Sequence, residues 1–162
     1  MPSISLRPSV DADRELLFEI YAATRAEELA PLPWDDDAKR AFLTQQFDAQ
    51  DSYYKQHRPD AAYDVIVVDG RPAGRLYVDR GSDQILVMDI ALLPEFRDRG
   101  LGTSLLRDLM DEAEAAGKPL VVHVEQFNPA RGLYERLGFR QTGDVGIYVE
   151  MQWTPAGAAP PS

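Results

Sequence analysis

The sequence predicts an α/β fold: a mixed, mostly antiparallel sheet of about seven strands with helices on both faces. Strand-like and helix-like patterns follow one another in the order βααβββαβαββ, which is typical of such a layered domain. The dipeptide Asp69-Gly70, between two strand-like runs, is a strong hairpin signal. A turn with two glycines, residues 97–103, leads from one strand-like run directly into a helix-like run.

The first half of the chain predicts one strand, two helices and a hairpin. The short alternating run that begins at Ile4 indicates the first strand, and Asp11 or Asp13 can cap the helix that follows it. A Pro-rich elbow around Trp34 separates this helix from the next, whose apolar residues recur at helical spacing. We expect strands over residues 4–7, 63–68 and 72–79, and helices over about 11–28 and 37–55.

The second half predicts four strands and two helices. Gly117 is a natural end for the helix after the glycine-rich turn. Pro129 suits the first turn of a short helix, which Gly138 ends. We expect strands over residues 85–93, 120–126, 139–142 and 146–153, and helices over about 104–116 and 129–137.

Length and composition indicate an ordinary globular protein. The 162 residues suit one domain over 1–154, followed by a disordered tail over 155–162 that lacks core-forming side chains. An apolar fraction of 44% and a charged fraction of 27% are typical of soluble proteins. No apolar run reaches the roughly 20 residues that span a bilayer, and the N-terminus shows no signal-peptide pattern. We therefore expect a cytoplasmic protein without membrane contact.

Charge and ligand chemistry exclude several classes of function. The net charge of −10 at pH 7 argues against nucleic-acid binding, which needs a basic surface to replace counterions. It suits a cationic or amine partner, although a solubilising acidic surface explains it as well. The chain has no cysteine, so disulfides and Cys-ligated metals are excluded. Neither His57 nor His123 has a second ligand at helical spacing, and we expect no metal site.

The glycine-rich turn has the chemistry of a seat for phosphate or pyrophosphate. Two glycines let the backbone turn tightly, and the N–H groups at the start of a helix have no intrahelical partner. It is neither a P-loop nor a dinucleotide fingerprint, because it has no lysine and Leu105 replaces the third glycine. A plain strand-to-helix turn remains the alternative. The turn consists of Arg97, Asp98, Arg99, Gly100, Leu101, Gly102 and Thr103.

Two motifs in order along the chain make it resemble the GNAT-type N-acetyltransferases, which use acetyl-CoA. Their pyrophosphate loop is Gln/Arg-x-x-Gly-x-Gly/Ala, and Arg97, Gly100 and Gly102 stand at its fixed positions. Their second motif, Asn-x-x-Ala/Gly-x-x-Leu-Tyr-x-x-x-Gly-Phe, is similar to residues 128–139. The resemblance is firm over about residues 85–139 and architectural elsewhere. It implies the family's fold, with acetyl-CoA as co-substrate.

The resemblance also implies roles for individual residues. The strand before the glycine-rich turn would pair with pantetheine through its backbone. The amide of Asn128 would bond the pantetheine arm or the helix on the cofactor side. Tyr134 would act as general acid to the leaving thiolate, since a tyrosine keeps its proton at neutral pH. Without the motif, a tyrosine packed on the sheet with its hydroxyl at the surface would be the better interpretation of Tyr134; with the motif, we favour catalysis. The implied cofactor contacts are Ile90, Ala91, Leu92, Arg97, Asp98, Arg99, Gly100, Leu101, Gly102, Thr103, Asn128 and Tyr134.

The general base follows from strand alternation. Leu120, Val122 and Val124 alternate onto one face of their strand, so His123 and Glu125 share the other face. An amine acceptor is mostly protonated at neutral pH, with a pKa near 10, so its proton must be removed. His123, or Glu125 acting through a water, can accept it. A His–Glu pair whose members only satisfy each other is the alternative.

The acceptor pocket is less clearly indicated. Family members commonly build it after the first helix, where Trp34 and the acidic run Asp35–Asp37 stand. That run attracts a cationic amine or simply caps the next helix. Arg25 and Glu28 at the end of the first helix are further candidate contacts, and Asp89 on the strand before the turn is a weaker one.

The function that we expect is N-acetylation of a primary amine by acetyl-CoA, through direct attack in a ternary complex. A small-molecule amine is the first expectation for the acceptor, and a protein N-terminus or lysine is the alternative. A third alternative, from another class, is a GNAT-fold module that binds acyl-CoA without turnover. Family habit adds the expectation of a homodimer. The acceptor's identity and the length of the acyl group are not readable from the sequence.

Overall fold

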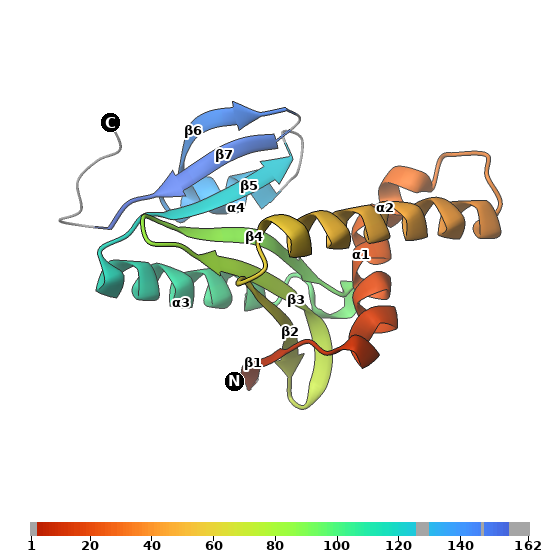
Figure 1. The fold of residues 1–162 in the computed structure, drawn as a ribbon, viewed down its shortest axis with the longest axis horizontal. Coiled ribbons are helices and arrows are strands. Elements are labelled where there is room, and N and C mark those ends of the chain that lie inside the picture. Colours follow the sequence, from red (N-terminus) through yellow and green to blue (C-terminus); the bar gives the residue numbers. More distant parts are fainter. Residues whose placement is uncertain (1–2, 126–129, 147, 156–162) are drawn as a thin grey trace. The chain divides into compact units, whose positions relative to one another are not determined.

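The computed structural model describes residues 3–125, 130–146 and 148–155 (Figure 1). Its elements follow the expected order βααβββαβαββ. The seven strands form one sheet in the order β1-β2-β3-β4-β5-β7-β6, and β4 and β5 are parallel, so the predicted mixed sheet and fold class are confirmed. The elements are β1 (Ile4–Pro8), α1 (Arg14–Leu29), α2 (Asp36–His57), β2 (Ala62–Val68), β3 (Arg71–Arg80), β4 (Ile85–Leu92), α3 (Leu101–Ala116), β5 (Leu120–Glu125), α4 (Ala130–Arg136), β6 (Arg140–Val145) and β7 (Tyr148–Trp153).

The chain divides into two compact units. The first comprises residues 1–76 and 91–97, and the second comprises residues 77–90 and 98–162. Strands β3 and β4 each contribute residues to both. The single domain over 1–154 stays a prediction. Of the expected tail, Pro155 is buried, and residues 156–162 lie outside the described part of the chain.

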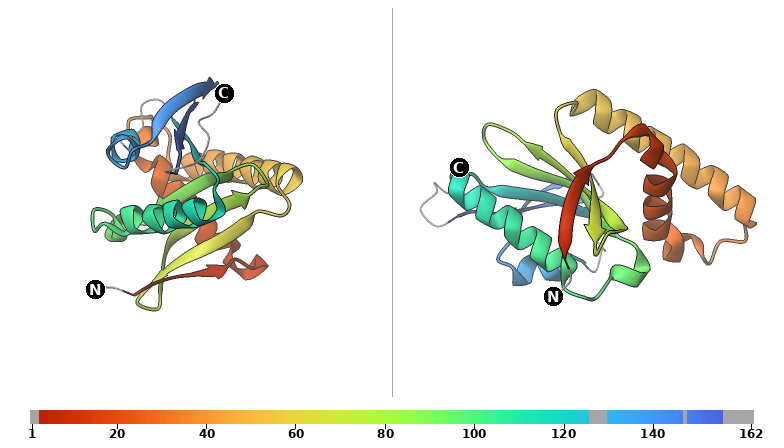
Figure 2. Two further views of the ribbon diagram at one scale, coloured as in Figure 1. Left: turned by 90° about the vertical axis from the view of Figure 1, so that its left-hand side faces the viewer. Right: turned by 90° about the horizontal axis from the view of Figure 1, so that it is seen from below.

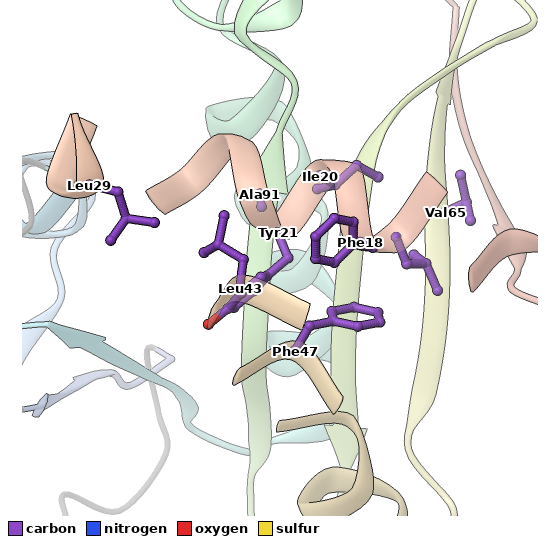
Figure 3. Close-up of a cluster of buried hydrophobic side chains, with 9 residues drawn as sticks. Phe18, Ile20, Tyr21, Leu29, Leu43, Phe47, Val65 and Ala91 are labelled. Atoms are coloured by element: carbon purple, nitrogen blue, oxygen red, sulfur yellow. The ribbon is translucent and has the colours of Figure 1, made fainter. Parts of the chain in front are cut away.

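In the first unit, helices α1 and α2 share an apolar core with the sheet. Phe18 and Phe47 meet edge to face, with their ring centroids 5.7 Å apart (Figure 3). Strand β1 lies antiparallel along β2 (Figure 2), from Ile4 opposite Val68 to Pro8 opposite Asp64. The buried cluster consists of Leu17, Phe18, Ile20, Tyr21, Leu29, Leu43, Phe47, Val65 and Ala91.

Of the two N-terminal caps predicted for α1 and α2, one is confirmed and one is wrong. At α2 the carboxylate of Asp35 accepts a hydrogen bond from the Ala38 N–H at 2.7 Å, so the capping interpretation of the acidic run is confirmed. At α1 the expected cap is wrong. A 3-10 turn precedes the helix and leaves Asp13 with helical dihedrals, so its carboxylate points back to the Val10 N–H (2.9 Å) and to the Arg7 guanidinium (2.8 Å). These bonds lower the pKa of Asp13 to about 2.

The backbones of β3 and β4 approach closely at Gly74. A Cβ atom at this position would lie 2.0 Å from the carbonyl oxygen of Ala91, which no side chain tolerates. On the same stretch, the Leu93 N–H donates to the Ala73 carbonyl at 2.8 Å. Glycine at position 74 therefore allows the end of β4 to lie this close to β3. This end of β4 leads into the glycine-rich turn.

In the second unit, β5 is the central strand. It pairs in parallel with β4 and antiparallel with β7, and β7 pairs antiparallel with β6. Helix α3 begins at Leu101, three residues before the expected Ser104, because the Ser104 N–H already donates to the Gly100 carbonyl at 3.0 Å. The helix ends at Gly117 as predicted. Its buried residues recur on one face and are Leu101, Leu105, Leu106, Leu109 and Ala113.

Within residues 3–125, 130–146 and 148–155, no helix is long and apolar enough to cross a membrane. In the same part of the chain, no three His, Cys, Asp or Glu side chains gather as ligands for a metal ion. The predicted start of α4, Pro129, lies outside the described residues.

The first prediction concerns Gly74. We expect Gly74→Ala to lower the free energy of unfolding by about 1–3 kcal/mol, because the added methyl group forces the β3 and β4 backbones apart. Gly143→Ala is the matched control, since a Cβ atom there meets no atom within 4 Å and no positive φ is involved. Urea unfolding of both variants measures the difference. A Gly74→Ala protein as stable as the control would contradict the close approach.

Candidate functional site

The glycine-rich turn places free N–H groups at the start of α3. Asp98 and Gly100 have φ angles of 60° and 77°, in the left-handed region. The first helical bond is the one that Ser104 donates to Gly100, so the N–H groups of residues 101–103 have no partner within the helix. The positive end of the helix dipole also lies at this end of α3 and favours an anion there. This is the backbone geometry that holds a phosphate group.

The space that a side chain at position 102 would enter is open. Its backbone needs no glycine, because its φ is not positive, and a Cβ atom there would meet no atom within 4 Å. Glycine nevertheless costs helix stability relative to alanine, by about 1 kcal/mol in a helix interior. Neither backbone strain nor packing within the chain explains Gly102. A ligand that approaches the helix start closely does explain it.

Arg97, the first residue of the motif, is engaged within the first unit. Its Nε–H donates to the Leu92 carbonyl at 3.0 Å, and its Nη2 donates to the Ala23 carbonyl at 3.4 Å. The side chain therefore links the end of β4 to α1. Sequence reasoning gave Arg97 only as a cofactor contact, and its bonds to Leu92 and Ala23 depend on a fold that local patterns do not reveal. The other arginine of the turn, Arg99, is exposed.

Strands β4 and β5 start side by side and then separate (Figure 1). Their parallel register runs from Ile85 opposite Leu120 to Val87 opposite Val122. Both strands continue, β4 to Leu92 and β5 to Glu125, with no further β4–β5 pair recorded between these described residues. Residues Met88–Ile90 of β4 therefore lie beyond the stretch that pairs with β5. This is the stretch on which the sequence predicts pairing with pantetheine.

Tyr134 on α4 is buried in the second unit, where Asp89 is close enough to influence it. The tyrosine is 4% exposed, and its ring lies edge to face on Phe139 with centroids 5.5 Å apart. Burial raises the pKa of the Tyr134 hydroxyl well above its usual value, and the Asp89 carboxylate raises it further. The phenol consequently keeps its proton over the whole range in which a protein is normally active, as the proposed acid requires.

His123 is paired with Glu150. Its Nε2 lies 3.4 Å from Oε2 of Glu150, which stands directly opposite it on β7. About one third of each of these two side chains is exposed. Glu125 lies two residues further along the same strand, and its side chain lies outside the described set, as does Asn128. The predicted pair of His123 with Glu125 stays a prediction, and the structure pairs His123 with a glutamate that the sequence analysis did not consider.

Thr142 completes this arrangement. Its hydroxyl donates to Oε1 of Glu150 at 2.9 Å. Thr142 lies at a β-bulge, because the register of β6 on β7 passes from Gln141 directly to Gly143. Sequence reasoning missed both Glu150 and Thr142. The acidic residue between two buried apolar neighbours, Val149 and Met151, was the available signal.

The candidate acceptor residues of the first unit lie in one aromatic cluster. The Arg25 guanidinium donates to the Tyr21 hydroxyl at 2.6 Å and forms an ion pair with Glu28. It also lies over the Phe42 ring, which Trp34 meets edge to face at 5.5 Å. Trp34 is 42% exposed, and this cluster thus offers an apolar surface beside an exposed carboxylate.

A separate hollow lies between α1 and α2, away from these residues. It has a volume of about 310 Å³, with Phe18 and Phe47 among its lining residues. Arg14 and Arg40, which also line it, are already paired with Asp48 and Glu19. The predicted site residues do not line this hollow.

Comparison with known proteins identifies the family. Residues 19–139 match the model of the acetyltransferase (GNAT) family, and the chain belongs to this family. A Bacillus subtilis protein named "putative ribosomal protein bS18-alanine N-acetyltransferase" is 35% identical over 99 residues, which cover 58% of this chain and 65% of that protein. The ribosomal protein bS18-alanine N-acetyltransferase of Salmonella typhimurium is 37% identical over 78 residues, which cover 47% of this chain and 53% of that protein.

Both alignments thus span less than two thirds of the relative's length. Among solved structures, the PaiA N-acetyltransferase of Thermoplasma acidophilum in complex with coenzyme A superposes with a TM-score of 0.70. The match covers 94% of this chain and 99% of that chain at 16% identity, and so shows the shared fold.

The second prediction concerns Asp98. Asp98→Gly removes a carboxylate beside the phosphate seat, and we expect coenzyme A to bind up to about threefold more tightly. Stability changes little, because relief of the left-handed conformation (about 1 kcal/mol) is offset by the greater chain entropy of glycine. Asp98→Asn is the control that removes the charge alone. Calorimetry measures both, and weaker binding by either variant would show that the carboxylate supports the loop.

Proposed function

We propose that the chain is an acetyl-CoA-dependent N-acetyltransferase whose acceptor is the N-terminal amine of a protein. The observation that carries the cofactor assignment is Gly102, where an added Cβ atom would meet no atom within 4 Å, which leaves room for a phosphate group at the start of α3. Family membership supports it. The N–H groups of residues 101–103 would hold the pyrophosphate, and the β4 backbone up to Leu92 would hold the pantetheine arm.

The roles of the catalytic side chains follow from their surroundings. Bound acetyl-CoA supplies an activated acetyl thioester. Tyr134 keeps its proton until negative charge develops beside it, because burial disfavours a phenolate and a thiolate alike. It then donates that proton to the leaving sulfur. His123, at the point where β5 parts from β4, accepts the proton of the attacking amine.

A protein acceptor is supported better than a small molecule. Both curated relatives are named for alanine acetylation on ribosomal protein bS18. The exposed Trp34 and the Glu28 carboxylate suit a peptide with a cationic N-terminus. The comparisons therefore favour the alternative over the small-molecule amine that we expected first. An alanine-initiated protein such as bS18 is the proposed substrate, and Trp34, Arg25, Glu28 and Asp89 remain its proposed contacts.

The third prediction tests the cofactor seat. Gly102→Leu fills the open space above α3, and we expect calorimetry to show at least a hundredfold weaker binding of acetyl-CoA. The same change replaces a poor helix former by a good one, so the free energy of unfolding should stay equal or rise by about 1 kcal/mol. Ser104→Ala, at an exposed position of the same helix, is the control. Unchanged affinity in Gly102→Leu would remove the pyrophosphate seat from this turn.

The fourth prediction concerns Tyr134. We expect Tyr134→Phe to lower kcat by about a hundredfold, as loss of a general acid does, with the Kd for acetyl-CoA unchanged. Because the pKa of Tyr134 is raised, its proton is lost only above the usual value near 10, so activity should not fall through this group at lower pH. Steady-state kinetics with an alanine-initiated peptide measure kcat. A variant that retains wild-type turnover would exclude Tyr134 from the mechanism.

The fifth prediction concerns the acceptor. A peptide with free N-terminal alanine should be acetylated at its α-amine, and mass spectrometry should place the acetyl group there. The same peptide with a blocked N-terminus and an internal lysine is the control, together with a panel of small amines. Preference for the lysine or for a small amine would refute the proposed acceptor. Binding of acetyl-CoA without turnover of any acceptor would favour a non-catalytic module.

A further inference from the structure

We propose that Glu150 and Thr142 are positioning residues that fix His123 as the Nε2–H tautomer and so present its Nδ1 as the proton acceptor. This inference rests on the proposed function and names two residues that act through His123. It concerns the second unit alone. Its evidence is the hydrogen-bond chain from β5 through β7 to β6.

The tautomer follows from the chemistry of the pair. The Glu150 carboxylate can only accept hydrogen bonds, so the Nε2 of His123, at 3.4 Å, must carry the proton. In a neutral imidazole the other nitrogen, Nδ1, then has the lone pair. Register supports the contact, because His123 and Glu150 stand directly opposite one another on antiparallel strands, where side chains on one face meet.

Thr142 fixes the carboxylate in turn. Its hydroxyl donates to Oε1 of Glu150 at 2.9 Å, while Oε2 faces His123. Both carboxylate oxygens are thus engaged, which restricts rotation of the carboxyl group. The β-bulge places Thr142 there, since this residue is the extra one in β6 and has no partner in the register with β7. Bulges commonly redirect a side chain beside an active site, at the expense of regular pairing.

The location of His123 suits the reaction. It is the first residue of β5 beyond the last pair registered with β4, where the two strands separate. In the proposed step the amine nitrogen forms a bond to the acetyl carbon and the carbon–sulfur bond breaks. The amine proton goes to Nδ1 of His123, and the Tyr134 hydroxyl proton goes to sulfur. Glu150 stabilises the imidazolium that results, and both side chains then exchange protons with water.

The tautomer can be observed in the free protein. The chain has two histidines, and His57 is an internal reference, because its Nδ1 lies 2.9 Å from the Tyr53 carbonyl and must donate to it. Two-bond ¹⁵N–¹H spectra at alkaline pH, where an imidazole is neutral, should show His57 as the Nδ1–H form and His123 as Nε2–H. Glu150→Ala should convert His123 to a mixture and leave His57 unchanged. An Nδ1–H form of His123 in the wild type, or no change in Glu150→Ala, would overturn the proposal.

Kinetics then test the role in turnover, with an alanine-initiated peptide as acceptor. Glu150→Ala should lower kcat by about ten- to a hundredfold, within the range for a misplaced general base, with KM for acetyl-CoA unchanged. Thr142→Val should cost about fivefold, the worth of one hydrogen bond, and Thr142→Ser should restore activity. Glu112→Gln breaks an ion pair of similar exposure with Arg80 and should change nothing.

A double variant separates positioning from general destabilisation. In a His123→Ala background, Glu150→Ala should cause no further loss of kcat, because its effect requires the imidazole. Additive losses would refute the proposal, as would full activity of Glu150→Ala. Absence of acetyl-CoA binding by the wild type would instead refute the proposed function. The tautomer measurement needs neither substrate and decides the role of Glu150 independently.

Discussion

The short parallel pairing of β4 with β5 is the constraint on which the proposed site depends. It stops at Val87 and Val122, although both strands continue. An amide-bearing ligand, the pantetheine arm, is the proposed occupant beside β4 beyond this point. Asp89 on one strand and His123 on the other lie just beyond the last registered pair.

In the first unit, close packing and two hydrogen bonds hold the end of β4. At Gly74 and Ala91 the β3 and β4 backbones are too close for any side chain, which fixes the course of β4. The bonds of Arg97 to the Leu92 and Ala23 carbonyls hold the end of the same strand. The turn that follows is open above Gly102. In the second unit, the N–H groups of residues 101–103 have no partner within the helix and can bind an anion.

Local patterns predicted the order of all eleven helices and strands, because hydrophobic periodicity, the Asp69-Gly70 turn and the helix-ending Gly117 act over a few residues. They failed where a side chain had two local choices, as at Asp13, which binds Arg7 instead of capping α1. Local patterns also could not predict the register of one strand on another. Glu150 meets His123 only through the alignment of β7 on β5, and Thr142 meets Glu150 only through a bulge. The names of the relatives favour the second of the two expected acceptors over the first, and few residues encode the acceptor locally.

Hydrogen exchange with and without coenzyme A tests the central claim most directly. If β4 beyond its pairing with β5 receives the pantetheine arm, amides of residues 88–90 and 98–103 should exchange more slowly in the complex, because the bound ligand suppresses local opening. Amides of the β1–β2 pair should keep their rates and serve as the reference. Protection confined to other segments, at a coenzyme A concentration that saturates binding, would contradict the account.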